Sequence, residues 1–274
     1  RQIELMKKSA IECFFMHARG GLKTEYMGKE WFDCIKACMD KADELGMEAW
    51  AYDENGWPSG FASGEVPKKS VDFQQKKLLS KVLANGETLP ENLIGLYRIG
   101  DNGFEIINAA EDGCFAVYYG INPYYIDTFN FDAIKYFIEE THEKYYKHFG
   151  DRFGKSLKGF FTDEPQYGKN VTPWSTLFPE LFLKEYGYSL TDNMPLLYFE
   201  FDGYEKFRSD FYNMAAKRFR ESFIKQMYDW CSEHNCKLTG HMMSEETFNS
   251  QLGATGGVMA CYEYFHEPGI DWLG

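Results

Sequence analysis

Gly159-Phe160-Phe161-Thr162-Asp163-Glu164-Pro165 is the stretch that decides the fold. An apolar run that ends in two carboxylates and a proline is typical of a buried strand, because proline stops the strand and stiffens the turn. In α/β-barrel enzymes the catalytic groups lie at this carboxyl end of the strands. Neighbouring carboxyl groups in a partly apolar setting raise each other's pKa, which suits a general acid. The stretch therefore predicts Glu164 as an acid catalyst beside Asp163. The structural alternative is a helix start, where both carboxylates would serve the helix dipole.

Short apolar runs alternate with amphipathic helices on both sides of this stretch, which indicates a parallel α/β fold. The expected strands are 11–16, 48–52, 114–119, 157–161 and 237–242, with a sixth near 269–271, and the expected long helices are 29–45, 132–149 and 204–234. About six βα units predict a single (β/α)8 TIM-type barrel domain over residues 1–274. Because a closed barrel has eight strands, we expect this one to be incomplete, with further strands beyond Gly274.

Residues 66–112 break the regular alternation and predict an insertion after the second strand. Within it, 68–83 has the composition of a helix. The runs 93–97 and 104–107 flank Asp101-Asn102-Gly103, a strong turn signal, and so predict a β-hairpin.

Charge and composition limit the partners. The 42 acidic and 29 basic side chains give a net charge of −13, which repels phosphate backbones, so we expect no nucleic-acid partner. No run of 18 apolar residues predicts a membrane span. Aromatic residues make up 18 % of the chain, enough to fill a core and also to stack on the apolar faces of sugar rings. A neutral carbohydrate is therefore an admissible ligand.

The seven cysteines are an odd number and include no C-x-x-C pair, which argues against a disulfide framework and against a zinc cluster. This usage favours a reducing, cytoplasmic setting, and the chain starts at Arg1 without an apolar signal segment. The sequence contains no G-x-S-x-G elbow, P-loop or H-E-x-x-H pattern. We therefore expect neither a metal nor another cofactor.

The second predicted strand ends in a polar and aromatic loop, residues 52–60. Sugar sites combine hydrogen-bonding groups with a stacking face, and this loop offers both. We expect its residues Tyr52, Asp53, Glu54 and Trp57 to contact substrate. The structural alternative is a polar turn around one buried tryptophan.

Two further strand ends carry polar side chains. His17 and Arg19 follow the first strand, and Arg19 can pair with a carboxylate across the mouth of the barrel. His241 and Glu245 follow the fifth predicted strand. We expect His17, Arg19 and His241 to bind substrate and Glu245 to be the second catalytic carboxylate, although a lone histidine is often only a core residue.

Taken in order, these runs resemble large bacterial glycoside hydrolases, and most closely the α-L-rhamnosidase-like family 106 with its uncharacterised relatives. The resemblance rests on His17 to Leu22, Tyr52 to Gly60, Gly159 to Pro165, Gly240 to Glu245 and Pro268 to Asp271, and it covers nearly the whole chain. It implies a TIM-barrel core that cleaves glycosidic bonds of plant-type oligo- or polysaccharides. Asp163-Glu164-Pro165 is also similar to the Asn-Glu-Pro strand end of a broad glycosidase clan, in which the Glu is the acid. Asp163 replaces that Asn. In such barrels the partner carboxylate often comes from strand seven, which the resemblance does not place within this sequence. Glu245 is therefore the stand-in for that carboxylate, and a partner beyond Gly274 is the alternative.

Two alternatives use the same residues. A non-catalytic carbohydrate-binding barrel would keep the aromatic and hydroxyl-binding groups but lack a competent carboxylate pair. A metal-dependent hydrolase or isomerase would instead use side chains of this set as ligands, namely His17, Asp53, Glu54, Asp163, Glu164 and His241.

Overall fold

The computed structural model describes residues 1–271, and its parallel sheet is open. The sheet has the order β1-β2-β7-β9-β10. Its strands are β1 (Cys13–Met16), β2 (Glu48–Tyr52), β7 (Leu157–Asp163), β9 (Lys237–His241) and β10 (Glu267–Pro268). Within residues 1–271, β1 and β10 are edge strands that do not join. The predicted (β/α)8 TIM-type barrel is therefore wrong, and the fold is α/β with one parallel and one antiparallel sheet.

The prediction failed at two segments that belong to the antiparallel sheet, whose order is β5-β4-β6-β3-β8. The expected third barrel strand lies in β6 (Phe115–Ile126), which pairs antiparallel with β3 (Gln74–Val82) along its length. The expected helix at 68–83 is mostly β3, preceded by the short helix α3 (Glu65–Lys69). The Gln-, Lys- and Leu-rich composition of β3 favours a helix locally, but pairing with β6 overrides that preference.

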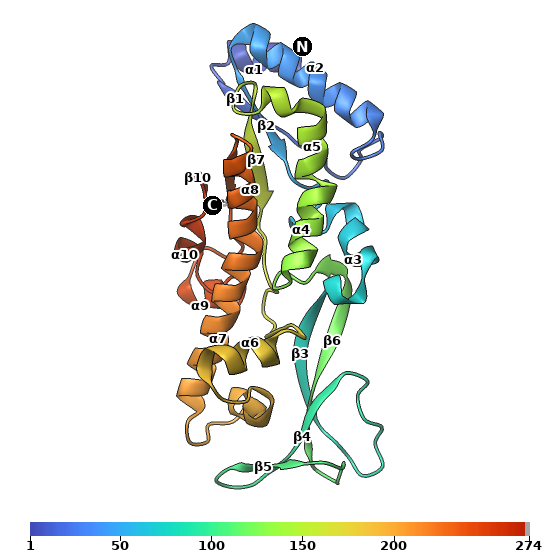
Figure 1. The fold of residues 1–274 in the computed structure, drawn as a ribbon, viewed down its shortest axis with the longest axis vertical. Coiled ribbons are helices and arrows are strands. Elements are labelled where there is room, and N and C mark those ends of the chain that lie inside the picture. The colour runs from blue at the N-terminus through green and yellow to red at the C-terminus, as the bar shows by residue number, and fades with distance from the viewer. Residues whose placement is uncertain (272–274) are drawn as a thin grey trace.

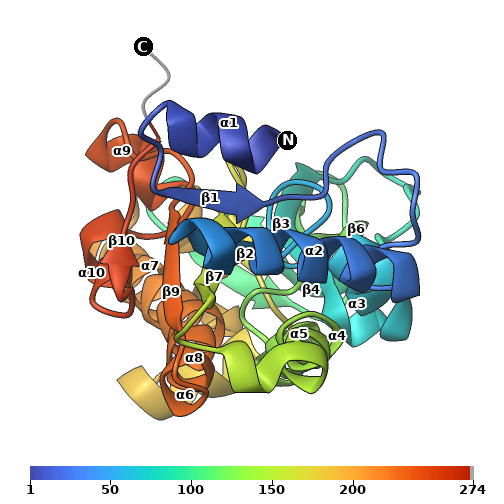
Figure 2. The same ribbon diagram turned by 90° about the horizontal axis from the view of Figure 1, so that it is seen from above.

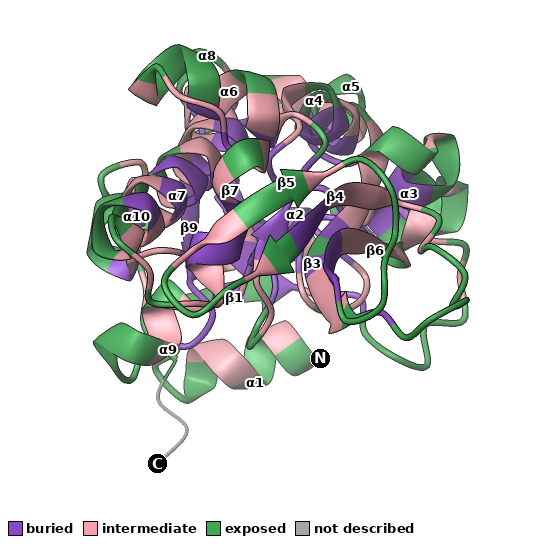
Figure 3. Ribbon diagram, turned by 90° about the horizontal axis from the view of Figure 1, so that it is seen from below, coloured by how far each residue is buried: buried purple, intermediate pink, exposed green. Residues whose placement is uncertain are grey.

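The expected hairpin is confirmed: β4 (Leu93–Ile99) pairs antiparallel with β5 (Phe104–Ile107). It lies at the end of the molecule farthest from α1 and α2, below β3 and β6 in Figure 1. Seen from that end, β5 carries only exposed and intermediate positions (Figure 3), whereas β4 also contains the buried Leu96 and Tyr97. The two-residue strand β8 (Pro173–Trp174) pairs with β3, so the segment that follows β7 returns to the antiparallel sheet.

The three long predicted helices are present, two of them interrupted. Helix α2 (Lys29–Leu45) has the predicted bounds and ends at Gly46, which adopts the left-handed conformation at φ 61°. Helices α4 (Phe131–Glu140) and α5 (His142–Phe149) divide the second, and α7 (Tyr204–Phe219) and α8 (Gln226–Glu233) flank a π-helical segment in the third. The shorter helices are α1 (Gln2–Lys8), α6 (Phe178–Tyr186), α9 (Phe248–Leu252) and α10 (Val258–Tyr262). Figure 2 looks down on the end of the molecule formed by α1 and α2.

The two faces of the parallel sheet differ, as alternation along β7 shows. Phe160 is fully buried and packs against Tyr145 of α5 and Trp230 of α8, so this face is covered by helices. Phe161 points to the opposite face, where its ring centroid lies 4.7 Å from that of Phe15. Phe15 is 44 % exposed, which makes this second face an accessible aromatic surface. Among residues 1–271, no helix is both long and apolar enough to cross a membrane.

Candidate functional site

Asp163, the last residue of β7, is the centre of a cluster of polar side chains. It lies beside His241 of β9 in the strand register, and His241 Nε2 is 3.2 Å from Asp163 Oδ1. Asp163 Oδ2 accepts a hydrogen bond from the Tyr52 hydroxyl and lies 3.6 Å from Arg19 Nη1. Three side chains that end or follow three other strands therefore converge on Asp163.

The charged groups in this cluster shift one another's pKa values. Burial alone would raise the pKa of Asp163, but its contacts with His241, Tyr52 and Arg19 lower the pKa below the ordinary value. Burial alone would lower the pKa of His241, yet the hydrogen bond to Asp163 and the nearby negative charges raise it. The contacts within this pair therefore favour the ionised form of Asp163 and the protonated form of His241 over their neutral forms.

Glu164 occupies a constrained position one residue beyond the strand. Its φ is 49°, in the left-handed region that few side chains adopt, and its N–H donates to the His241 carbonyl oxygen at 3.1 Å. The Trp57 indole Nε1–H donates to Glu164 Oε2 at 2.7 Å. Burial raises the pKa of Glu164, the Trp57 hydrogen bond and His241 oppose that rise, and the Asp163 charge adds to it. A raised pKa favours a carboxyl group that keeps its proton for donation.

His17 extends the same face of the sheet. Its ring stacks on that of Tyr52, with centroids 3.5 Å apart and planes 12° from parallel. Burial and the positive charge of Arg19 lower the pKa of His17 to about 4, so its imidazole is neutral at neutral pH. His17 thus offers a flat, uncharged face beside the cluster.

Asp53 and Glu54 lie close to the site but are fully buried beneath it. Glu54 accepts hydrogen bonds from four backbone N–H groups of its own loop, those of Asn55, Phe61, Ala62 and Ser63. Burial, opposed by these bonds, raises the pKa of Glu54 to about 7. Ser59 Oγ donates to Asp53 Oδ1 at 2.5 Å and accepts from the Asp163 N–H at 2.8 Å. The geometry gives these two carboxyl groups a role in shaping the loop that carries Trp57.

Glu245 lies beside the cluster, with both carboxylate oxygens engaged. Oε1 accepts from the Met242 N–H and the Tyr262 hydroxyl, and Oε2 accepts from the Asp271 N–H at 3.1 Å. Glu245 therefore fixes the position of Asp271, a residue that our sequence analysis quoted but did not select. Its signal was the strand-end run Pro268 to Asp271, which has the same character as the run that ends in Glu164.

Glu164, His241 and Asp271 form the one group of potential metal ligands within residues 1–271 that is spaced for an ion. One ligand atom from each lies within 4.8 Å of the others. Two carboxylates with one imidazole suit a divalent cation. His17, Asp53 and Glu54, which the sequence alternative included, are not part of this group.

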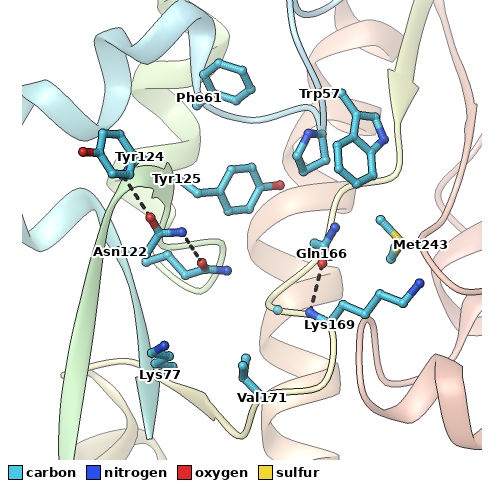
Figure 4. A pocket seen from close by; sticks show the side chains of 13 residues that line it. Trp57, Phe61, Lys77, Asn122, Tyr124, Tyr125, Gln166, Lys169, Val171 and Met243 are labelled. Atoms are coloured by element: carbon cyan, nitrogen blue, oxygen red, sulfur yellow. Dashed lines mark hydrogen bonds between the residues drawn. The ribbon is translucent and has the colours of Figure 1, made fainter.

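A pocket of about 660 Å³ opens beside Trp57 (Figure 4). One wall comes from the loop after β2 and another from the antiparallel sheet, and the segments that follow β7 and β9 complete it. Sequence reasoning missed its polar residues from the antiparallel sheet, Gln75 and Asn122, and also Gln166 beyond Glu164. Strand pairing between distant segments brings them together, and no local pattern marks them.

Comparison with known proteins supports the fold and leaves the family open. No family model matches the sequence, and no curated protein does. Among solved structures, the chain is similar to a rhamnosidase from Novosphingobium sp. PP1Y, with a TM-score of 0.62 and 12 % sequence identity. The match covers 96 % of this chain and 46 % of that one, so this chain spans about half the length of the rhamnosidase. At this identity the likeness is one of fold. The expected resemblance to rhamnosidases holds at that level, and membership of family 106 stays a prediction.

Proposed function

We propose that this chain carries a glycoside-hydrolase site in which Glu164 is the general acid. The observation that carries the proposal is the setting of Glu164: a partly buried carboxyl group at the carboxyl end of β7, with a raised pKa, fixed by Trp57 next to a large pocket. The shared fold with a rhamnosidase supports the reaction class and makes a 6-deoxyhexoside such as a rhamnoside the first substrate to test.

In this mechanism Glu164 gives its proton to the glycosidic oxygen as the bond from that oxygen to the anomeric carbon breaks. The bond's electron pair leaves with the oxygen, and positive charge develops on the sugar ring. Arg19, Tyr52 and His241 hold Asp163 in place, so its negative charge stays beside Glu164 and favours the protonated acid.

Asp271 is our candidate for the second carboxylate, with Glu245 as the residue that positions it. Retaining enzymes hold their two carboxyl groups about 5–5.5 Å apart and inverting enzymes about 6.5–9.5 Å. The ligand atoms of Glu164 and Asp271 lie within 4.8 Å, which is closer to the retaining spacing. Asp271 would then attack the anomeric carbon, and Glu164 would later remove a proton from the water that releases the sugar.

The test is Glu164→Gln, assayed on aryl rhamnosides with good and with poor leaving groups. The amide keeps the shape of the side chain but has no acidic proton. Loss of acid catalysis slows the poor leaving groups by roughly 10²–10⁴-fold, while activated phenolates, which leave without protonation, lose far less. Glu246→Gln, an exposed neighbour beyond β9, is the matched control and should keep full turnover.

Other outcomes have definite meanings. Equal losses on both substrate types would make Glu164 a nucleophile or a base. No loss on either would refute the proposal. Sugar binding without any turnover in the unsubstituted chain would favour the non-catalytic carbohydrate-binding alternative.

A metal-dependent hydrolase is the second candidate, favoured by the spacing of Glu164, His241 and Asp271. Its test is calorimetric titration of Ca²⁺, Mn²⁺ and Zn²⁺ into the chain and into His241→Gln. A metal-dependent mechanism requires that a cation binds the chain and that His241→Gln weakens this binding. It also requires that EDTA abolishes turnover and that adding the same cation restores it. The acid mechanism is favoured if EDTA does not change turnover and if the rate loss in Glu164→Gln depends on the leaving group.

A further inference from the structure

The pocket beside Trp57 is connected to Glu164 through Trp57. Trp57 donates its indole hydrogen bond to Glu164 and also lines the pocket, together with Pro58. Met243, two residues beyond His241, closes the same end. Glu164 does not itself line the pocket, and its link to the pocket is the hydrogen bond with Trp57, which places the pocket next to the candidate acid.

The pocket wall combines flat aromatic faces with organised amides. Tyr124 is 81 % exposed and stands at the rim, with the buried Tyr125 beside it (Figure 4). Asn122 Nδ2 donates to Gln75 Oε1 at 2.9 Å, and Asn122 Oδ1 accepts from the Tyr124 N–H at 3.1 Å. The amide groups are therefore held in fixed orientations next to stacking surfaces, which is the arrangement that sugar rings require.

Gln166 adds a polar side chain that is only 8 % exposed. Its Oε1 accepts from the Lys169 N–H at 3.0 Å, which fixes the turn that follows β7. This bond also places Lys169 at the pocket, and Figure 4 shows Gln166 and Lys169 on the wall that faces Asn122.

The charge of the pocket is opposite to that of the protein. The chain has a net charge of −13, yet the described residues that line the pocket include Lys77 and Lys169 and no Asp or Glu. Both lysines are exposed, and within residues 1–271 neither ammonium group has a carboxylate partner in an ion pair. Most other lysines on this acidic surface have such a partner, for example Lys81 with Glu87. Two unpaired cations beside aromatic and amide groups favour an anionic ligand with a ring.

We propose that this pocket is the leaving-group subsite and that it accepts a sugar residue carrying an anionic group, a carboxylate or a sulfate ester. The inference rests on the proposed function for its place in the reaction and extends it by naming the substrate class. The ring would stack against the aromatic wall, and Gln75, Asn122 and Gln166 would contact its hydroxyl groups. Lys77 or Lys169, which Figure 4 shows on different walls of the pocket, would pair with the anion.

The experiment measures binding and needs no turnover. Three probes share one ring: methyl α-galactoside, its uronic acid methyl α-galacturonoside, and methyl α-galactoside 6-sulfate. Their Kd values are obtained by ligand-observed NMR titration of the chain at low salt. We expect the uronic acid or the sulfate to bind at least about tenfold more tightly than the neutral sugar, the size of one hydrogen bond to a charged group. The stronger of the two anions identifies the natural source.

Matched variants locate the effect. Lys77→Gln combined with Lys169→Gln should remove the preference, whereas Lys184→Gln, an exposed lysine of α6 outside the pocket, should retain it. Tyr124→Ala should weaken all three probes alike, because stacking does not depend on the charge of the ligand. Raising the salt concentration should reduce the preference through screening.

Equal affinity for the three probes, or a preference that survives in the double lysine variant, would overturn the inference. Neither result would change how the rate loss in Glu164→Gln depends on the leaving group, so the proposed function would still stand. The opposite combination is also informative. If the anionic probes bind more tightly in a lysine-dependent way, but Glu164→Gln does not change turnover, the proposed acid is refuted and the anionic sugar site is retained.

Discussion

The indole Nε1–H of Trp57 lies 2.7 Å from Oε2 of Glu164 and ties the loop after β2 to the end of β7. The two residues are far apart in the sequence and follow neighbouring strands of the parallel sheet. Through this bond the loop that borders the pocket also controls the proton affinity of the candidate acid.

Trp57→Phe tests that control. Removing the indole N–H takes away a hydrogen bond that lowers the pKa of Glu164, so we expect this pKa to rise further. The basic limb of the pH–rate profile should therefore move to higher pH. The control is Trp174→Phe, because the buried indole N–H of Trp174 has no hydrogen-bond partner in the described part of the chain. A shift to lower pH in Trp57→Phe would contradict the assignment.

Glu54 is expected to stabilise its loop. Its carboxylate accepts hydrogen bonds from four backbone N–H groups. In Glu54→Gln one of the two acceptor oxygens is replaced by an NH₂ donor, which faces those N–H groups. The resulting unsatisfied buried groups should cost roughly 1–3 kcal/mol in urea unfolding. Glu65→Gln, which breaks an exposed ion pair with Lys68, should cost less than about 1 kcal/mol. Equal costs would show that Glu54 has no special structural role.

Gly240 is required by the close approach of β9 to β7. Its φ is 137°, and a Cβ there would lie 2.0 Å from the Thr162 carbonyl oxygen. Gly240→Ala should therefore destabilise the fold by at least about 3 kcal/mol, from backbone strain and overlap together. Because His241 follows directly, the variant should also lose the contact with Asp163. Gly103→Ala, where a Cβ meets nothing within 4 Å, should be nearly neutral, and a similar loss in both variants would refute the argument.

The sequence predicted those elements whose information is local. Helix α2 has the periodic apolar face and the glycine stop that define it, and β2 has the predicted bounds. The convergence of Tyr52, Asp163 and His241 followed from a general rule, since the carboxyl ends of parallel strands meet at one edge of a sheet.

The sequence predictions failed where pairing between distant strands determines the structure. Residues 114–119 resemble any buried strand, and only their pairing with β3 and β4 assigns them to an antiparallel sheet. That error supplied the extra unit in the barrel count and hid the pocket, because Asn122 and Gln75 were placed in unrelated elements. Glu245 was selected by its position after a strand, and its catalytic role stays a prediction; no local pattern shows that it accepts a hydrogen bond from the Asp271 N–H.

The pair formed by Asp163 and His241 predicts a dependence of stability on pH. The pKa of Asp163 is lowered in the folded state, so its contribution is present above the unfolded value of about 4 and is lost as the pH falls through the folded value. The pKa of His241 is raised, so its contribution is complete below the unfolded value of about 6.5 and is lost as the pH rises through the folded value. Both contributions are present together between roughly pH 4 and 6.5.

His241→Gln isolates the histidine part of this effect. The free energy of unfolding lost in the variant should be larger by roughly 1–2 kcal/mol at about pH 5.5 than at about pH 9, because only the protonated imidazole gains from the aspartate. His266→Gln is a control of opposite sign. Burial lowers the pKa of His266, and its Nδ1 accepts the Leu238 N–H at 3.0 Å, so its stabilising contribution should fade on acidification. Urea unfolding of both variants across this pH range provides the measurement. If the loss in His241→Gln were independent of pH, the imidazole would be neutral beside Asp163, and Glu164 would not have a positive charge next to it.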